Sequence, residues 1–195
     1  MNIILVGPRI AIVALVLSAT PGFAQAVPPA DDGVLQFVRA SEDYASMHRR
    51  IERQMPSVAV NANPETIRRA IDAMSAVVRA ERAGAKPGDL FNPTVQATLR
   101  IRIAKALRSQ GYTPLDVMAA ERAEGVDPAA TNLRVNGIFP WAMATKMFPC
   151  VLEALPPLPP ELQYRLVGRD LVLVDVHASV IVDIMWRALG GDTTF

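Results

Sequence analysis

The amino-acid sequence predicts an α+β fold, in which an N-terminal layer of about four helices packs with a small C-terminal antiparallel β-meander. Residues 162–185 contain three short runs of alternating apolar residues separated by two turn signals, a pattern typical of consecutive strands. The preceding part of the chain carries apolar residues at spacings of three and four, as amphipathic helices do. Because a half-buried sheet of this size needs a second layer, we expect the helices to cover it.

The N-terminus has the layout of a signal peptide. An uninterrupted apolar run from Ile10 to Leu17 follows Arg9, and Ala24-Gln25-Ala26 supplies small residues for cleavage. The run is shorter than the roughly 20 residues of a membrane-spanning helix, and Pro21 ends it early, which disfavours a retained membrane anchor. We therefore expect cleavage near Ala26 and a periplasmic or secreted protein.

The remaining chain is expected to form one mature domain over residues 27–195, since 195 residues suit a single core. Within it, residues 27–125 are predicted to be helical and residues 126–195 loop-rich, with the meander at 162–185. No later segment is long and apolar enough to span a bilayer.

Four helices are expected, each preceded by a capping residue or opened by a proline. They span about 32–55, 64–83, 93–110 and 114–125. Residues 57–63, between the first two helices, form either an extended connector or an edge strand. The inward-facing residues predicted for the second and third helices are Ile67, Ile71, Met74, Val77 or Val78, and Val95, Leu99, Ile103 and Leu107.

Pro, Gly and Asn at short intervals predict loops from Val126 up to the meander, interrupted by a short strand at Leu133–Val135 and a short helix at Lys146–Leu155. The meander strands are expected over 162–167, 170–174 and 180–185. Twofold alternation in the last strand places Val180, Val182 and Ile184 on one face and Ile181, Asp183 and Met185 on the other.

Charge and cysteine content narrow the function classes. Arginine and acidic residues interleave along the helices, which indicates a solvated surface, and we expect no nucleic-acid partner. Cys150 is the single cysteine, so no intramolecular disulfide is possible. We expect a small buried apolar side chain there; the alternatives are an intermolecular disulfide and a reactive thiol.

Parts of the chain resemble exported proteins. The segments RAERAGAKPGDLFNPTV, LRVNGIFP and LPPLPPELQYRLVGRDLVLVDVHASVIVDIM resemble a family of uncharacterised exported bacterial proteins, over about residues 78–185. The segment YRLVGRDLVLVDVHASVIVDIM is also similar to the closing hairpin of RcnB-like periplasmic proteins, a group linked to nickel and cobalt homeostasis. The first resemblance implies location and architecture, and the second implies a shared hairpin more than a shared activity.

His177 and Asp175 are the candidate metal ligands, because Asp175-x-His177 places two ligating side chains on one side of an extended segment. A transition-metal site usually needs three or four ligands, and the sequence contains no cluster of His or Cys, so a solvated turn is the alternative. His48 is expected at the surface of the first helix. Asp175 and Asp183 are otherwise expected to keep the strand edges soluble.

Catalytic and cofactor-binding residues are not assigned, because Gly-x-Ser-x-Gly, Ser-x-x-Lys and His-Glu-x-x-His do not occur. The preferred function is a non-enzymatic binding or protein-interaction module of unknown ligand. The alternatives are a small hydrolase-like enzyme of unrecognised type and a periplasmic metal-binding or stress protein that uses the 175–177 turn. The expected interaction surface, for an unknown protein partner or self-association through the first helix, comprises Phe37, Tyr44, Met47, Ile51 and Met55.

Overall fold

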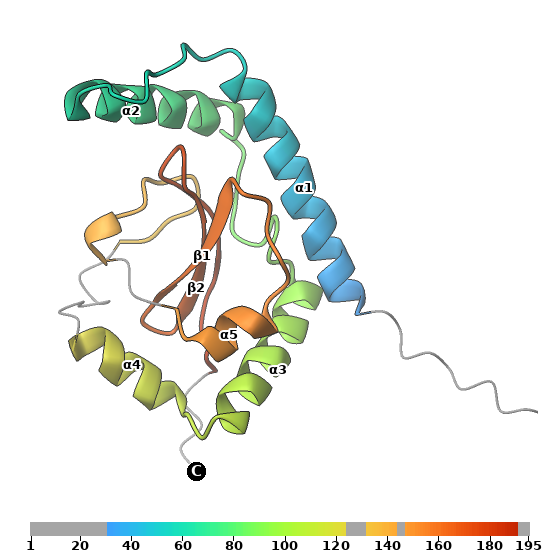
Figure 1. The fold of residues 1–195 in the computed structure, drawn as a ribbon. Helices are drawn as coiled ribbons and strands as arrows, with labels where there is room; N and C mark the ends of the chain where they lie inside the picture. The colour runs from blue at the N-terminus through green and yellow to red at the C-terminus, as the bar shows by residue number, and fades with distance from the viewer. Residues whose placement is uncertain (1–30, 124–131, 144–146, 191–195) are drawn as a thin grey trace, which may run out of the picture.

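The computed structural model describes residues 31–123, 132–143 and 147–190 and confirms the α+β fold (Figure 1). The helices are α1 (Asp32–Glu52), α2 (Pro64–Glu81), α3 (Pro93–Ser109), α4 (Pro114–Ala123), the 3₁₀ turn η2 (Trp141–Met143) and α5 (Pro149–Ala154). The strands are β1 (Leu162–Val167), β2 (Asp170–Asp175) and β3 (Val180–Met185). The expected signal peptide lies outside the described residues.

Local capping explains why α2 and α3 begin where the sequence predicts. The side chain of Asn63 accepts a hydrogen bond from the backbone N–H of Thr66 at 2.8 Å, and Asn92 does the same for Val95 at 3.0 Å. Proline occupies the first turn of both helices, where its missing N–H costs nothing. The 57–63 segment is a connector with no strand, and Leu133–Val135 is not a strand either.

The three strands form an antiparallel sheet in the order β1-β2-β3. A bulge interrupts the β2–β3 ladder, because Leu173 pairs with Asp183 while the next residue, Val174, pairs with Ile181. Val182 is thus an extra residue and shifts the alternation. The predicted faces of β3 are therefore correct up to Val182 and wrong after it. Val180 and Val182 join one core cluster and Ile181 the other, as predicted, but Met185 joins the first cluster and Ile184 the second.

The larger core cluster lies between one sheet face and the helices. All four residues predicted to face inward from α3, Val95, Leu99, Ile103 and Leu107, are buried in it. Phe37 of α1 stacks on Phe91 with the ring centroids 5.3 Å apart. The opposite sheet face packs on a smaller cluster around Phe139, whose segment, residues 132–141, hydrogen-bonds to the start of β3.

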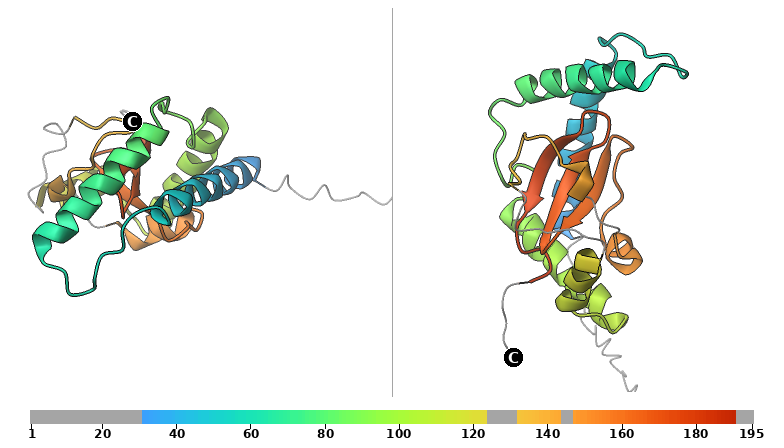
Figure 2. Two further views of the ribbon diagram at one scale, coloured as in Figure 1. Left: turned by 90° about the horizontal axis from the view of Figure 1, so that it is seen from above. Right: turned by 90° about the vertical axis from the view of Figure 1, so that its left-hand side faces the viewer.

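Helix α2 lies across one end of the sheet, with α3, α4 and α5 toward the other end (Figure 2). This placement confirms the predicted inward stripe of α2 at Met74 and Val78 and corrects it at Ile67. Met74 and Val78 are buried, whereas Ile67 and Val77 are each 41% exposed, because only part of α2 contacts the core. Within the described residues, no helix is both long and apolar enough to cross a membrane.

Candidate functional site

Helix α1 presents a line of polar side chains toward the end of the sheet. Tyr44, His48 and Glu52 are spaced by four residues and therefore lie on one face of the helix, one turn apart. Tyr44 and His48 are buried, and Glu52 at the C-terminal end of the helix is exposed. This face of α1 is therefore buried in the core at Tyr44 and reaches the solvent at Glu52.

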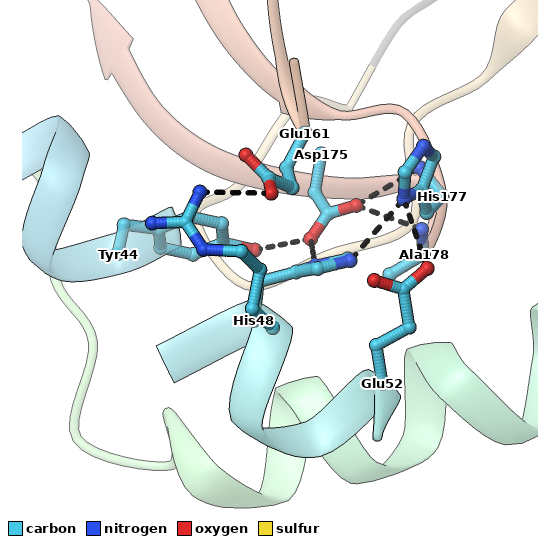
Figure 3. A network of polar contacts seen from close by, with 8 residues as sticks. Tyr44, His48, Glu52, Glu161, Asp175, His177 and Ala178 are labelled. Atoms are coloured by element: carbon cyan, nitrogen blue, oxygen red, sulfur yellow. Dashed lines mark hydrogen bonds and ion pairs between the residues drawn. The ribbon is translucent and has the colours of Figure 1, made fainter. Parts of the chain in front are cut away.

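Asp175 is the acceptor around which this site is built (Figure 3). It is the last residue of the central strand β2, and its side chain is completely buried. One carboxylate oxygen, Oδ2, accepts hydrogen bonds from the Tyr44 hydroxyl and from His48 Nδ1, both at 2.6 Å. The other oxygen, Oδ1, accepts the backbone N–H groups of His177 at 3.0 Å and Ala178 at 2.8 Å. Both oxygens therefore have two partners each.

The hydrogen bond to Asp175 fixes the tautomer of His48. A carboxylate can only accept, so His48 Nδ1 carries the proton and donates it. In the neutral imidazole, Nε2 is then unprotonated and offers a lone pair. The same carboxylate also organises the turn that carries His177, and it thereby sets the position of both imidazoles.

The unprotonated Nε2 of His48 faces the second imidazole. His177 Nδ1 lies 3.3 Å from it, and Glu52 Oε1 lies 3.6 Å from His177 Nδ1. One ligand atom from each of His48, Glu52 and His177 lies within 4.8 Å of the others. Two nitrogens bound to one tetrahedral zinc ion at 2.0–2.1 Å are about 3.3–3.4 Å apart, so the imidazole separation fits a shared metal ion.

Electrostatics reinforce the buried pair. Burial lowers the pKa of His48, but the hydrogen bond and the charge of Asp175 outweigh it, and the pKa is raised overall. Burial raises the pKa of Asp175, yet the hydrogen bonds from His48 and Tyr44 lower it below its ordinary value. Burial and the neighbouring Asp175 raise the pKa of the Tyr44 hydroxyl, which therefore stays protonated and donates.

A second carboxylate borders this network. Glu161 precedes β1, is buried, and accepts a hydrogen bond from Arg49 Nη1 at 3.1 Å. Its backbone carbonyl accepts the N–H of Val176 at 3.0 Å, which ties the start of β1 to the turn. Glu161 is thus a structural neighbour of the His48, Glu52 and His177 cluster and not a member of it.

The two predicted ligands, His177 and Asp175, lie close together in the structure, but only His177 belongs to the cluster that could hold a metal ion. The oxygens of Asp175 accept hydrogen bonds from Tyr44, His48 and the turn. Asp175 instead lies behind His48, where second-sphere carboxylates that orient metal-bound histidines are found. The expectation that Asp175 and Asp183 are solvated strand-edge residues is wrong, since both side chains are buried and accept several hydrogen bonds.

His48 is the residue that sequence reasoning missed. The sequence predicts it at the helix surface, because Arg49 and Arg50 follow it, but its side chain is fully buried. The available signal was the spacing His48-x-x-x-Glu52, which places two ligands on one face of a helix. The partner that makes His48 a site residue, Asp175, is far away in sequence and could not be identified from it.

The expected interaction surface on the first helix is also corrected. Phe37, Tyr44 and Ile51 are buried in the interior, and Met47 and Met55 are partly buried against the larger core cluster. The apolar stripe is explained by the sheet and α3 that it covers. These side chains do not form an open docking surface. Cys150, expected to be buried, is only partly buried and packs against the same cluster.

Comparisons with known proteins give no relative for this fold or site: no family model, curated protein or solved structure matches the chain. The class that the structure itself defines is an α+β protein with a carboxylate-supported pair of histidines at the edge of its core.

Proposed function

We propose that this protein binds one divalent transition-metal ion, such as zinc, through His48 Nε2, His177 Nδ1 and the Glu52 carboxylate. The observation that carries the proposal is the 3.3 Å separation of the two imidazole nitrogens, together with the Asp175 hydrogen bond that leaves Nε2 unprotonated. Two histidines and one carboxylate suit zinc, copper and nickel better than the hard ions magnesium and calcium. The ligand of the expected binding module is, on this proposal, a metal ion.

A purely structural explanation competes with this proposal. Without metal, His177 Nδ1–H can donate to His48 Nε2, and the cluster is then a hydrogen-bond chain. A hydrogen bond between the buried His48 and the half-exposed His177 adds little stability, because His177 can bond to water instead. A metal ion would replace that proton and use the lone pairs of both nitrogens, and the facing rings suit this arrangement.

The test is metal binding by the purified chain, measured by native mass spectrometry and titration calorimetry with zinc, nickel, cobalt and copper. We expect one equivalent to bind, and we expect His177→Ala and Glu52→Gln each to lower the affinity at least about tenfold. Glu42→Gln is a matched control, since Glu42 is an exposed glutamate on the same helix. Unchanged metal binding in Cys150→Ser would exclude the Cys150 thiol as a ligand.

Absence of a stoichiometric adduct, or an affinity that His177→Ala leaves unchanged, would contradict the metal site. Loss of binding in Cys150→Ser with full binding in His177→Ala would move the ligand to the cysteine. The exposed residues His177 and Glu52 are preferred for these variants, because replacing the buried His48 is expected to change folding as well.

We also infer that the protein is exported, which the apolar run Ile10–Leu17 and the Ala24-Gln25-Ala26 pattern support. N-terminal sequencing of the protein isolated from its native cell envelope tests this inference. A mature terminus near Val27 in the periplasmic or secreted fraction is the expected result. Intact chains in the cytoplasm would contradict it.

A further inference from the structure

A cleft of about 1060 Å³ adjoins the proposed metal ligands. The end of α1, the connector that follows it and the first half of α2 form its walls, and Glu52 and His177 both line it. Most of the other lining side chains are apolar; they include Met55, Val58, Ile67 and Ile71. Its volume is just above the usual range for small-molecule sites, about 300–1,000 Å³.

Part of the apolar lining is not explained by the protein core. Val58 and Ile67 are each 41% exposed, although Ile67 belongs to the helix stripe that the sequence predicts to face inward. Leaving these side chains in a hollow exposes them to water at a cost that a bound apolar group would remove. The cleft is therefore suited to bind the apolar chain of a small molecule.

The free coordination position of the proposed ion faces this cleft. His48 is fully buried and approaches the ion from the protein interior. The side chains of Glu52 and His177 are 53% and 48% exposed and approach it along the cleft wall. Three protein ligands leave at least one position open on a tetrahedral ion. With the interior side occupied, that position is on the cleft side.

The charges around the cleft favour an anionic head group. Arg53 and Arg69 line it together with the single acidic residue Glu52, which the proposed ion would neutralise. A carboxylate is a suitable fourth ligand for zinc and an acceptor for arginine. An ammonium group would be repelled by the same charges.

We propose, on the basis of the proposed metal site, that this cleft binds a carboxylate carrying an apolar chain. The carboxylate takes the open position on the ion, and the chain lies along Val58, Ile67 and Ile71. The ion and the apolar cleft then both contribute to the affinity for the ligand. We therefore expect the carboxylate to bind more weakly to the apo protein, and a neutral ligand of the same chain length to bind more weakly to the metal-loaded protein.

The experiment uses cobalt as the metal probe, because its visible absorption changes when its coordination changes. The purified chain is loaded with one equivalent of cobalt and titrated with hexanoate, octanoate and 1-octanol, and binding is followed by absorption and calorimetry. We expect octanoate to alter the cobalt spectrum and to bind up to about fifteenfold more tightly than hexanoate, since each buried methylene contributes up to about fourfold. We expect 1-octanol to bind more weakly and the apo protein to bind octanoate at least about tenfold more weakly.

A matched pair of variants tests the cleft itself. Ile67 and Val77 lie on the same helix and are equally exposed, at 41%, but only Ile67 lines the cleft. Ile67→Ser is expected to weaken octanoate binding severalfold and leave cobalt affinity unchanged, whereas Val77→Ser is expected to change neither.

The two proposals fail in different ways. If none of cobalt, zinc, nickel and copper binds, the metal site and the cleft inference are both wrong. If cobalt binds but octanoate binds equally well to apo and loaded protein, or not at all, only the cleft inference is overturned. The same holds if light scattering shows a dimer that Ile67→Ser dissociates, because a second copy then occupies the cleft.

Discussion

The Nδ1 atom of His48 lies 2.6 Å from Oδ2 of Asp175, although the two residues are 127 positions apart in the sequence, and both side chains are fully buried. This contact joins the first helix to the end of the central strand. Tyr44, one turn earlier, donates to the same oxygen, so two buried donors share one carboxylate oxygen. Buried polar networks of this kind are stable only while every member has its partner.

Asp175→Asn is expected to destabilise the fold by about 3–5 kcal/mol, because it removes the charged partner of a buried pair. An amide also offers only one acceptor oxygen to four donors. Urea unfolding followed by circular dichroism measures the change. Asp72→Asn, on the exposed side of α2, is the control and should stay within about 0.5 kcal/mol. A loss for Asp175→Asn no larger than that of the control would show that the network carries no stability.

Tyr44→Phe is expected to cost about 1.5–3 kcal/mol, the range for a hydrogen bond to a charged acceptor. The ring and its contact with the Arg82 guanidinium, 5.2 Å from the ring centroid, are retained. Metal affinity should change little, because His48 still bonds to Asp175. Tyr112→Phe, at a 44% exposed ring, is the control for unfolding measurements. Loss of metal binding in Tyr44→Phe would instead assign the hydroxyl a part in holding the ion.

Much of the fold followed from local signals in the sequence. The Asn-Pro pairs at 63–64 and 92–93 predict helix starts because cap and proline act within one turn. The meander was predicted because alternation and the Gly168 turn, at φ 63°, are also local. The orientation of the β3 residues after the bulge could not be predicted in this way, since the bulge at Val182 depends on which residues of β2 pair with β3.

The site was less predictable, because its chemistry is set by contacts between distant segments. His177 could be proposed from the Asp175-x-His177 pattern, but the position of Asp175 behind His48 required the helix to be placed on the sheet. The same limit explains the first helix: its apolar stripe predicts a buried face without saying what buries it. Here the sheet and α3 bury it.

Metal affinity is expected to fall as the pH falls. The pKa of His48 is raised above its ordinary value of 6.5, since the interactions with Asp175, Glu52 and Glu161 outweigh burial, which acts in the opposite direction. The ion needs an unprotonated Nε2, so protons compete with it below that raised pKa, and each further pH unit should lower the apparent affinity by about tenfold. Zinc titrations between pH 5 and 8, about the range in which histidine titrates, measure the slope. An affinity independent of pH would exclude the imidazoles as ligands.

Stability of the metal-free protein should change with pH in the opposite sense. A folded-state pKa above the unfolded value means that protonated His48 stabilises the fold below about pH 6.5, and that this contribution is lost as the pH rises through the folded pKa. The lowered pKa of Asp175 adds stability above its unfolded value of 3.8, which is lost as the pH falls through the folded pKa. Urea unfolding of the apo protein across this range checks both signs, and a profile without the decline above pH 6.5 would contradict the His48 assignment.

Asp183→Asn is expected to destabilise the fold by about 3 kcal/mol, through the loop before α3 rather than through the site. Asp183 accepts the backbone N–H groups of Gly88 at 3.0 Å and of Leu90 and Phe91 at 2.8 Å. An asparagine NH₂ group would face at least one of these donors and leave it without an acceptor, at about 1–3 kcal/mol for each buried group. Asp89→Asn is the control, because Asp89 accepts only the exposed N–H of Lys86 among the described contacts. Thermal unfolding compares the two; equal midpoints would mean that the loop is not held by Asp183.

Gly33→Ala is expected to destabilise the fold by about 1–3 kcal/mol, even though alanine is the better helix former. A Cβ atom at residue 33 would lie 2.6 Å from Thr98 Oγ1 and 3.0 Å from the Thr94 carbonyl oxygen, so α1 would have to move away from α3. Gly84→Ala is the matched control, because no heavy atom lies within 4 Å of a Cβ there, and the change should be neutral or slightly stabilising. The close approach at Gly33 helps to set where α1 lies and therefore where His48 meets Asp175. If unfolding measurements show Gly33→Ala to be neutral while zinc affinity is unchanged, that close helix contact does not control the position of the site.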